Sequence, residues 1–160
     1  MADPLVRTLQ ELRARRLRAP LLLALWTLLA VETIGGLVIF AARLVRGTTP
    51  GEALHVVAGV LLTAVYALYQ WGHWRRVRPA RPQLHYALGV IAAASMALTN
   101  LSGLWLAVFW WQERVVAAGG AAVRYPATLS AIHNVASMVV LTFVAAHVGA
   151  VLFRDRDLRR

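Results

Sequence analysis

The sequence predicts an all-α membrane protein, a four-transmembrane-helix bundle built from two similar helical hairpins, with both termini in the cytoplasm. The first observation is composition: of 160 residues, 59% are hydrophobic and only 15% are charged, whereas soluble domains average about 45–50% apolar and about 25% charged residues. The second is the length of four apolar stretches, and the third is the placement of the 17 basic residues, which are all Arg.

A membrane-spanning helix needs about 20 mostly apolar residues, and four stretches of the chain meet this requirement. They are Pro20–Ala42, Ala53–Gly72, Leu84–Trp111 and Thr128–Phe153. Turn-forming residues at 46–51, 75–83 and 112–126 separate them. We therefore expect a basic N-terminal arm (1–19), a four-helix transmembrane domain (20–153) and a basic tail (154–160).

The Arg residues indicate which way the chain crosses the membrane. Thirteen of the 17 lie in the N-terminal arm, the second loop and the C-terminal tail, which fall on one side of a four-span chain. By the positive-inside rule that side is the cytoplasm, so we expect a multi-pass protein of the plasma (inner) membrane. This topology explains the net charge of +10 without a nucleic-acid partner, and binding of anionic lipid is the minor alternative.

The two halves of the chain resemble each other. A shift of 78 positions aligns the segment around His55 with the segment around His133, and a shift of 67 aligns Thr33–Leu37 with Asn100–Leu104. The first two spans would then correspond to the last two, as parallel repeats.

The absence of cysteine excludes disulfides and thiolate metal sites, and it leaves histidine as the principal metal ligand. His55 and His133 each lie a few residues inside the outer end of a span. At matched depth they are candidate axial ligands of one haem, since bundles commonly hold cofactors between facing helices. His147 follows His133 by 14 residues, on nearly the same helix face and roughly 21 Å away, which suggests a second, inner haem.

The inner site has two candidate partners for His147, namely His73 and His85, and both flank the Arg-rich loop. Gly36 and Gly103 are expected near the level of the outer histidines, where a missing Cβ permits either haem approach or close helix packing. Glu32 would either relay protons or form a hydrogen bond to a neighbouring helix.

The spacing of His133 and His147 resembles the last span of the cytochrome b subunits of formate dehydrogenases and nickel–iron hydrogenases. The stretch from Leu54 to Gly59, followed by Gly72–Arg76, is similar to the compact flavinylation-associated cytochromes. These resemblances imply a four-helix protein with b-type haem that links a redox partner to the quinone pool. They also imply that His55, His133 and His147 are haem ligands.

The leading hypothesis is therefore transmembrane electron transfer by haem b, with one or two haems, in a subunit of a larger redox complex. Membrane lipid, other subunits of that complex and quinone are the expected partners, and any catalysis would belong to a partner subunit. The alternatives are a structural or assembly subunit, either chlorophyll-binding or cofactor-free, and a metal-ion transporter, which the lack of intramembrane acidic clusters disfavours.

Overall fold

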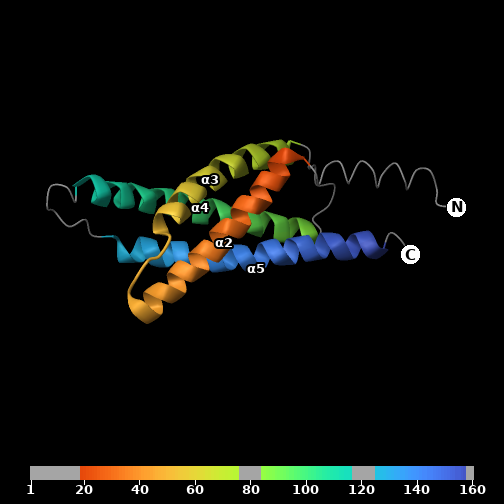
Figure 1. The fold of residues 1–160 in the computed structure, drawn as a ribbon. Coiled ribbons are helices and arrows are strands. Elements are labelled where there is room, and N and C mark those ends of the chain that lie inside the picture. Colours follow the sequence, from red (N-terminus) through yellow and green to blue (C-terminus); the bar gives the residue numbers. More distant parts are fainter. Residues whose placement is uncertain (1–18, 76–83, 117–124, 158–160) are drawn as a thin grey trace. The chain divides into compact units, whose positions relative to one another are not determined.

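The computed structural model describes the backbone of residues 19–75, 84–116 and 125–157, and the side chains of residues 19–75, 86–115 and 125–150. Within these ranges the regular structure is entirely α-helical. The helices are α2 (Pro20–Arg46), α3 (Glu52–Trp74), α4 (Leu84–Val116) and α5 (Ala127–Asp157) (Figure 1). Each contains a segment long and apolar enough to cross a membrane. The all-helical prediction is confirmed, and the four helices indicate a multi-pass membrane protein.

The helices are longer than the apolar stretches that predicted them. The largest differences are at the C-terminal ends of α2 and α5, which continue to Arg46 and Asp157, and at that of α4, which continues to Val116. The prediction that residues 112–116 belong to a loop was wrong. Apolar composition marks the part of a helix that lies in hydrocarbon, whereas Gln, Glu and Arg are good helix formers that extend the same backbone beyond it.

The link between α2 and α3 is the turn predicted at residues 46–51, although Arg46 still belongs to the helix. Gly47 ends α2 with a φ of 65°, and its N–H donates to the carbonyl of Arg43 at 3.1 Å. Gly51 precedes α3 with a φ of 76°. Both angles lie in the left-handed region that glycine adopts without strain.

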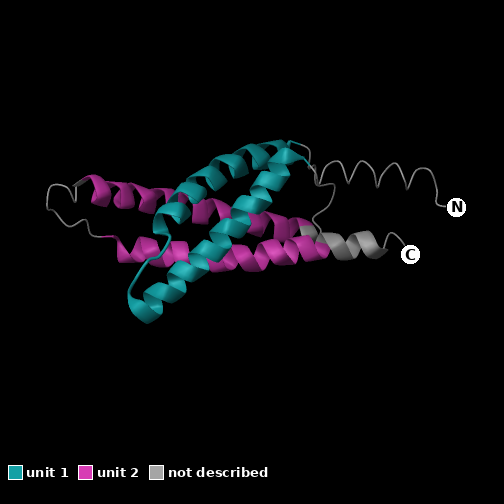
Figure 2. Cartoon of the chain, in the orientation of Figure 1, with its two compact units in different colours: residues 1–77 teal, residues 78–160 magenta. Residues whose placement is uncertain are grey.

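The chain divides into two compact units, residues 1–77 and residues 78–160 (Figure 2). In unit 1, α2 packs against α3, and in unit 2, α4 packs against α5. Each unit is described by itself below. The N-terminal arm (residues 1–18), most of the Arg-rich loop (76–83) and the end of the basic tail (158–160) lie outside the described residues.

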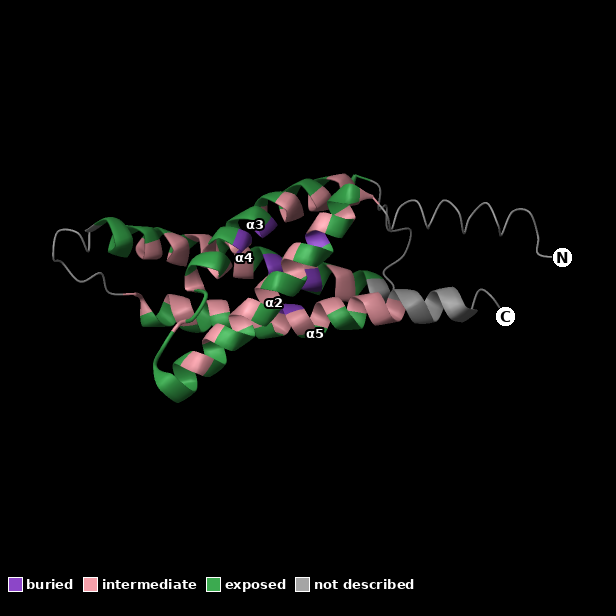
Figure 3. Ribbon diagram, viewed as in Figure 1, coloured by how far each residue is buried: buried purple, intermediate pink, exposed green. Residues whose placement is uncertain are grey.

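Few described side chains are buried, and most of those are small or of medium size (Figure 3). The buried set is Leu25, Ala58, Leu62, Ala92, Met96, Ser102, Ala136 and Val140. Large apolar residues such as Leu44 and Val45 are exposed on the helix surfaces. This pattern is typical of helices in lipid, where small residues allow close backbone approach and large apolar side chains meet acyl chains.

Candidate functional site

In unit 1 the imidazole of His55, near the start of α3, lies against two glycines of α2. A Cβ added at Gly36 would stand 3.3 Å from His55 Cε1, and one added at Gly35 would stand 3.9 Å from Nδ1. The first distance is tighter than ordinary van der Waals contact, so Gly36 provides the space that the ring occupies. We call such a seat, an imidazole edge against a glycine of the neighbouring helix, a glycine notch.

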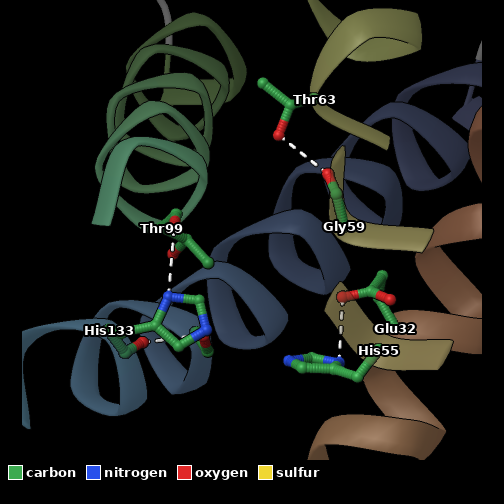
Figure 4. Close-up of polar contacts among 7 residues, drawn as sticks. Glu32, His55, Gly59, Thr63, Thr99 and His133 are labelled. Atoms are coloured by element: carbon green, nitrogen blue, oxygen red, sulfur yellow. Dashed lines mark hydrogen bonds and ion pairs between the residues drawn. The ribbon is translucent and has the colours of Figure 1, made fainter. Parts of the chain in front are cut away.

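The other side of the His55 ring meets a carboxyl group. Glu32 lies one turn before Gly36 on α2, and its Oε2 is 3.0 Å from His55 Nδ1 (Figure 4). The two side chains are 13% and 25% exposed, respectively. The distance is that of an ion pair, but the pair is poorly aligned as a hydrogen bond. The contact agrees with the prediction that Glu32 interacts with a neighbouring helix.

In unit 2 His133 of α5 occupies an equivalent notch on α4. A Cβ at Gly103 would lie 2.9 Å from His133 Cε1 and 3.4 Å from Nδ1. The Nδ1 atom is 3.1 Å from the carbonyl oxygen of Thr99 (Figure 4) and 3.2 Å from Ser102 Oγ. Both residues are on the turn of α4 that ends at the glycine.

These contacts determine the tautomer of His133. A backbone carbonyl can only accept a hydrogen bond, so Nδ1 must carry the proton that it donates to Thr99. The buried hydroxyl of Ser102 in turn donates to backbone carbonyls, at 2.7 Å to Leu98 and 3.0 Å to Thr99. In this tautomer the lone pair of the neutral ring is on Nε2, which is the form in which imidazole binds a metal.

A third notch lies further along the same two helices, and it was missed in the sequence. A Cβ at Gly89 of α4 would lie 2.9 Å from His147 Cε1 and 3.1 Å from its Nδ1. His147 follows His133 by 14 residues, and Gly89 precedes Gly103 by 14 residues. In two antiparallel helices equal steps in opposite directions preserve the facing pairs. The spacing of the glycines was therefore the available signal.

The outer notches of the two units share more than the His–Gly pair. In both units the group that meets Nδ1 belongs to the residue four positions before the glycine, Glu32 before Gly36 and Thr99 before Gly103. These are the positions related by the shift of 67 that was found in the sequence. The two hairpins therefore repeat a local arrangement, and not merely a few residue types.

The remaining predicted site residues have different outcomes. Gly36 and Gly103 lie at the level of the outer histidines, as predicted, although what they contact is the imidazole itself. His73 stacks on Tyr69 within α3, with ring centroids 5.7 Å apart. The backbone of His85 belongs to α4, but its side chain lies outside the described residues. His55 and His133 are in different units, so their pairing stays a prediction.

Comparisons with known proteins add no identity to this geometry. No family model, no curated protein and no solved structure matches the chain. Among the described residues, no three His, Asp or Glu side chains gather as a candidate metal-ion cluster. What the structure defines is an all-helical candidate membrane protein whose apolar helices hold three histidines in glycine notches.

Proposed function

We propose that this protein is a b-type cytochrome that transfers electrons across the membrane as a subunit of a larger redox complex. The observation that carries the proposal is the state of His133, which lies within a membrane-spanning helix with Nδ1 held by a backbone carbonyl and the lone pair on Nε2. Intramembrane histidines are functional candidates by default, and this one has the tautomer of a haem ligand.

The residues present fit haem in two respects. The donor set consists of neutral imidazoles in apolar helices, with a second hydrogen-bonding partner for Nδ1 of the kind that orients metal-binding histidines. The glycine notches are cradles that a Cβ would fill, so each ring has a defined seat. On this proposal His55 and His133 hold the outer haem, and His147 holds a second, with His73 or His85 as its partner.

The chain itself positions these groups. Haem iron, when bound, supplies reversible one-electron transfer. The notches of unit 2 are 14 residues apart along α5, which corresponds to roughly 21 Å of helix, so two haems would lie at different depths of the bilayer. With the termini in the cytoplasm, the inner site would face the cytoplasmic side of the plasma membrane. Membrane lipid, quinone and other subunits of the complex are the proposed partners.

A reduced-minus-oxidised absorption spectrum of the purified, haem-supplied protein tests this proposal. A sharp b-type α band is expected, and the haem-to-protein ratio distinguishes one site from two. His55→Ala and His133→Ala should each remove the outer haem, and His147→Ala should remove only the second. Val135→Ala is the control, because Val135 lies two residues from His133 and is 64% exposed. A flat spectrum from folded protein would refute the proposal, and so would full haem content in every variant.

A structural or assembly subunit is the second candidate, and one observation favours it. A histidine that lies in a glycine notch and donates to a backbone carbonyl is also a satisfied packing element, as small and polar residues are at many helix interfaces in lipid. On this alternative the chain is stable without any cofactor or holds chlorophyll on single histidines. The spectrum distinguishes these outcomes, since chlorophyll and haem absorb differently.

A further inference from the structure

Unit 1 contains a carboxyl group beside one of the proposed ligands, and unit 2 has a different group at the equivalent place. We propose that Glu32 is a positioning residue that holds Nδ1 of His55 and lowers the reduction potential of the haem that this histidine binds. The two ligands of the outer haem would then be chemically unequal. This inference rests on the proposed cytochrome function and assigns to Glu32 a role in it.

The contact between Glu32 and His55 is specific in its atoms. Oε2 lies 3.0 Å from Nδ1, the nitrogen that does not bind the iron when Nε2 does. A carboxylate accepts hydrogen bonds, so it favours the tautomer with the proton on Nδ1 and the lone pair on Nε2. Carboxylate partners of this kind fix the ring orientation of metal-binding histidines and raise their basicity.

The carboxyl group occupies a space that the neighbouring helix leaves open. Gly59 of α3 follows His55 by one turn, and a Cβ added there would lie 3.2 Å from Glu32 Oε2. Alanine at this position would push against the carboxyl group. The absence of a side chain at Gly59 therefore belongs to the same arrangement as the Glu32–His55 contact.

The equivalent residues of unit 2 support this reading. The shifts of 67 and 78 that relate the two hairpins place Thr99 at the position of Glu32, and Ser137 at the position of Gly59. A long acidic side chain thus accompanies glycine in unit 1, and a short hydroxyl side chain accompanies serine in unit 2. The two positions differ together and in opposite directions of size, as expected if both belong to one packing arrangement.

The consequence is a difference of charge between the two histidines. His133 donates to the neutral carbonyl of Thr99, whereas His55 meets a carboxyl oxygen. Negative charge beside an axial ligand stabilises the oxidised iron more than the reduced iron. Because charge and hydrogen bonding around the ligands tune reduction potentials, the Glu32 side of the site lowers the potential.

Potentiometric titration of the full-length, haem-loaded protein at one fixed pH tests the inference. Glu32→Gln keeps the size and a hydrogen-bond acceptor but removes the charge. We expect it to retain haem and to raise the midpoint potential of one haem by at least a tenfold change in the ratio of oxidised to reduced form, about 59 mV for one electron. Glu52→Gln is the matched control, because it removes the same charge from the first turn of α3, where the carboxyl group meets Thr49 at 3.3 Å.

A haem-free measurement separates this inference from the proposed function. Side-chain ¹⁵N NMR of the cofactor-free protein reports the tautomer of His55. The Nδ1–H form is expected in the wild type and in Glu32→Gln, and a mixture of tautomers is expected in Glu32→Leu. An unchanged tautomer in Glu32→Leu, or a potential shift in Glu32→Gln no larger than in Glu52→Gln, would overturn the inference. Absence of haem from the wild type would instead overturn the proposed function.

Discussion

Alanine at Gly103 is the most informative single change, because the structure gives the size and the direction of its effect. The new Cβ would lie 2.9 Å from His133 Cε1, so the ring must retreat by at least about half an ångström to reach ordinary contact. The ring is held on its other side, with Nδ1 3.1 Å from the Thr99 carbonyl. Retreat therefore stretches or breaks this hydrogen bond.

The expected magnitude follows from three contributions. Overpacking costs about 1–3 kcal/mol, and the lost hydrogen bond costs about 0.5–1.5 kcal/mol. Alanine in place of glycine in a helix returns about 1 kcal/mol. The net effect of Gly103→Ala is a loss of roughly 1–3 kcal/mol in the free energy of unfolding, together with reduced binding of haem at His133.

Other glycines provide a graded series of controls. A Cβ at Gly89 would approach His147 as closely, at 2.9 Å, so its alanine variant should lose similar stability but affect the second haem. At Gly36 the distance is 3.3 Å, and a smaller loss is expected. No atom lies within 4 Å of a Cβ at Gly149. Gly149→Ala should therefore be neutral or stabilising, opposite in sign to Gly103→Ala.

The assay is unfolding in mixed detergent micelles titrated with SDS, followed by helical circular dichroism of the cofactor-free protein. The haem content of each reconstituted variant is measured in parallel. If Gly103→Ala were as stable as Gly149→Ala, the packing described at His133 would be incorrect. If stability fell but haem content stayed complete, the notch would be a packing feature without a role in holding the ligand.

Three further changes test separate features of the molecule. Ser102→Ala removes one of the two groups near His133 Nδ1 but leaves the Thr99 carbonyl, so we expect a loss of about 0.5–1.5 kcal/mol in the same SDS titration and an unchanged tautomer by ¹⁵N NMR; a switched tautomer would contradict our assignment. Tyr125→Phe removes the hydroxyl that donates to Glu113 Oε2 at 2.8 Å in an exposed position, and its cost, read from thermal unfolding, should stay below about 1.5 kcal/mol. Thr49→Cys introduces the sole cysteine of the chain between α2 and α3, and it should react with a membrane-impermeant maleimide from outside intact cells; labelling only after lysis would reverse the predicted orientation.

The helices could be predicted from the sequence because the strongest constraint on them is chemical. Lipid requires each backbone polar group to be paired within its own segment, so four apolar stretches of sufficient length had to become helices. Their ends could not be predicted from the same signal. Residues 112–116, with Gln112, Glu113 and Arg114, look like a loop by polarity, yet nothing in them stops the helix until after Val116.

The candidate site was predictable in its histidines and less so in their neighbours. Gly36 and Gly103 could be related to His55 and His133 because the internal repeat aligned them. Gly89 lies in a stretch of small and apolar residues, where a glycine has many meanings. Its contact with His147 depends on the register between α4 and α5, and the intervening connection does not fix that register.

The 14-residue step also explains why the two units differ on the cytoplasmic side. In unit 2, 14 residues before Gly103 and after His133 lie Gly89 and His147, the second notch. The same steps in unit 1 lead from Gly36 to Leu22 and from His55 to Tyr69. Both members of the notch are thus replaced together, a glycine by a large side chain and a histidine by an aromatic residue that stacks on His73. A notch without its imidazole has no reason to keep its glycine, so the paired replacement argues that each glycine is present for its histidine.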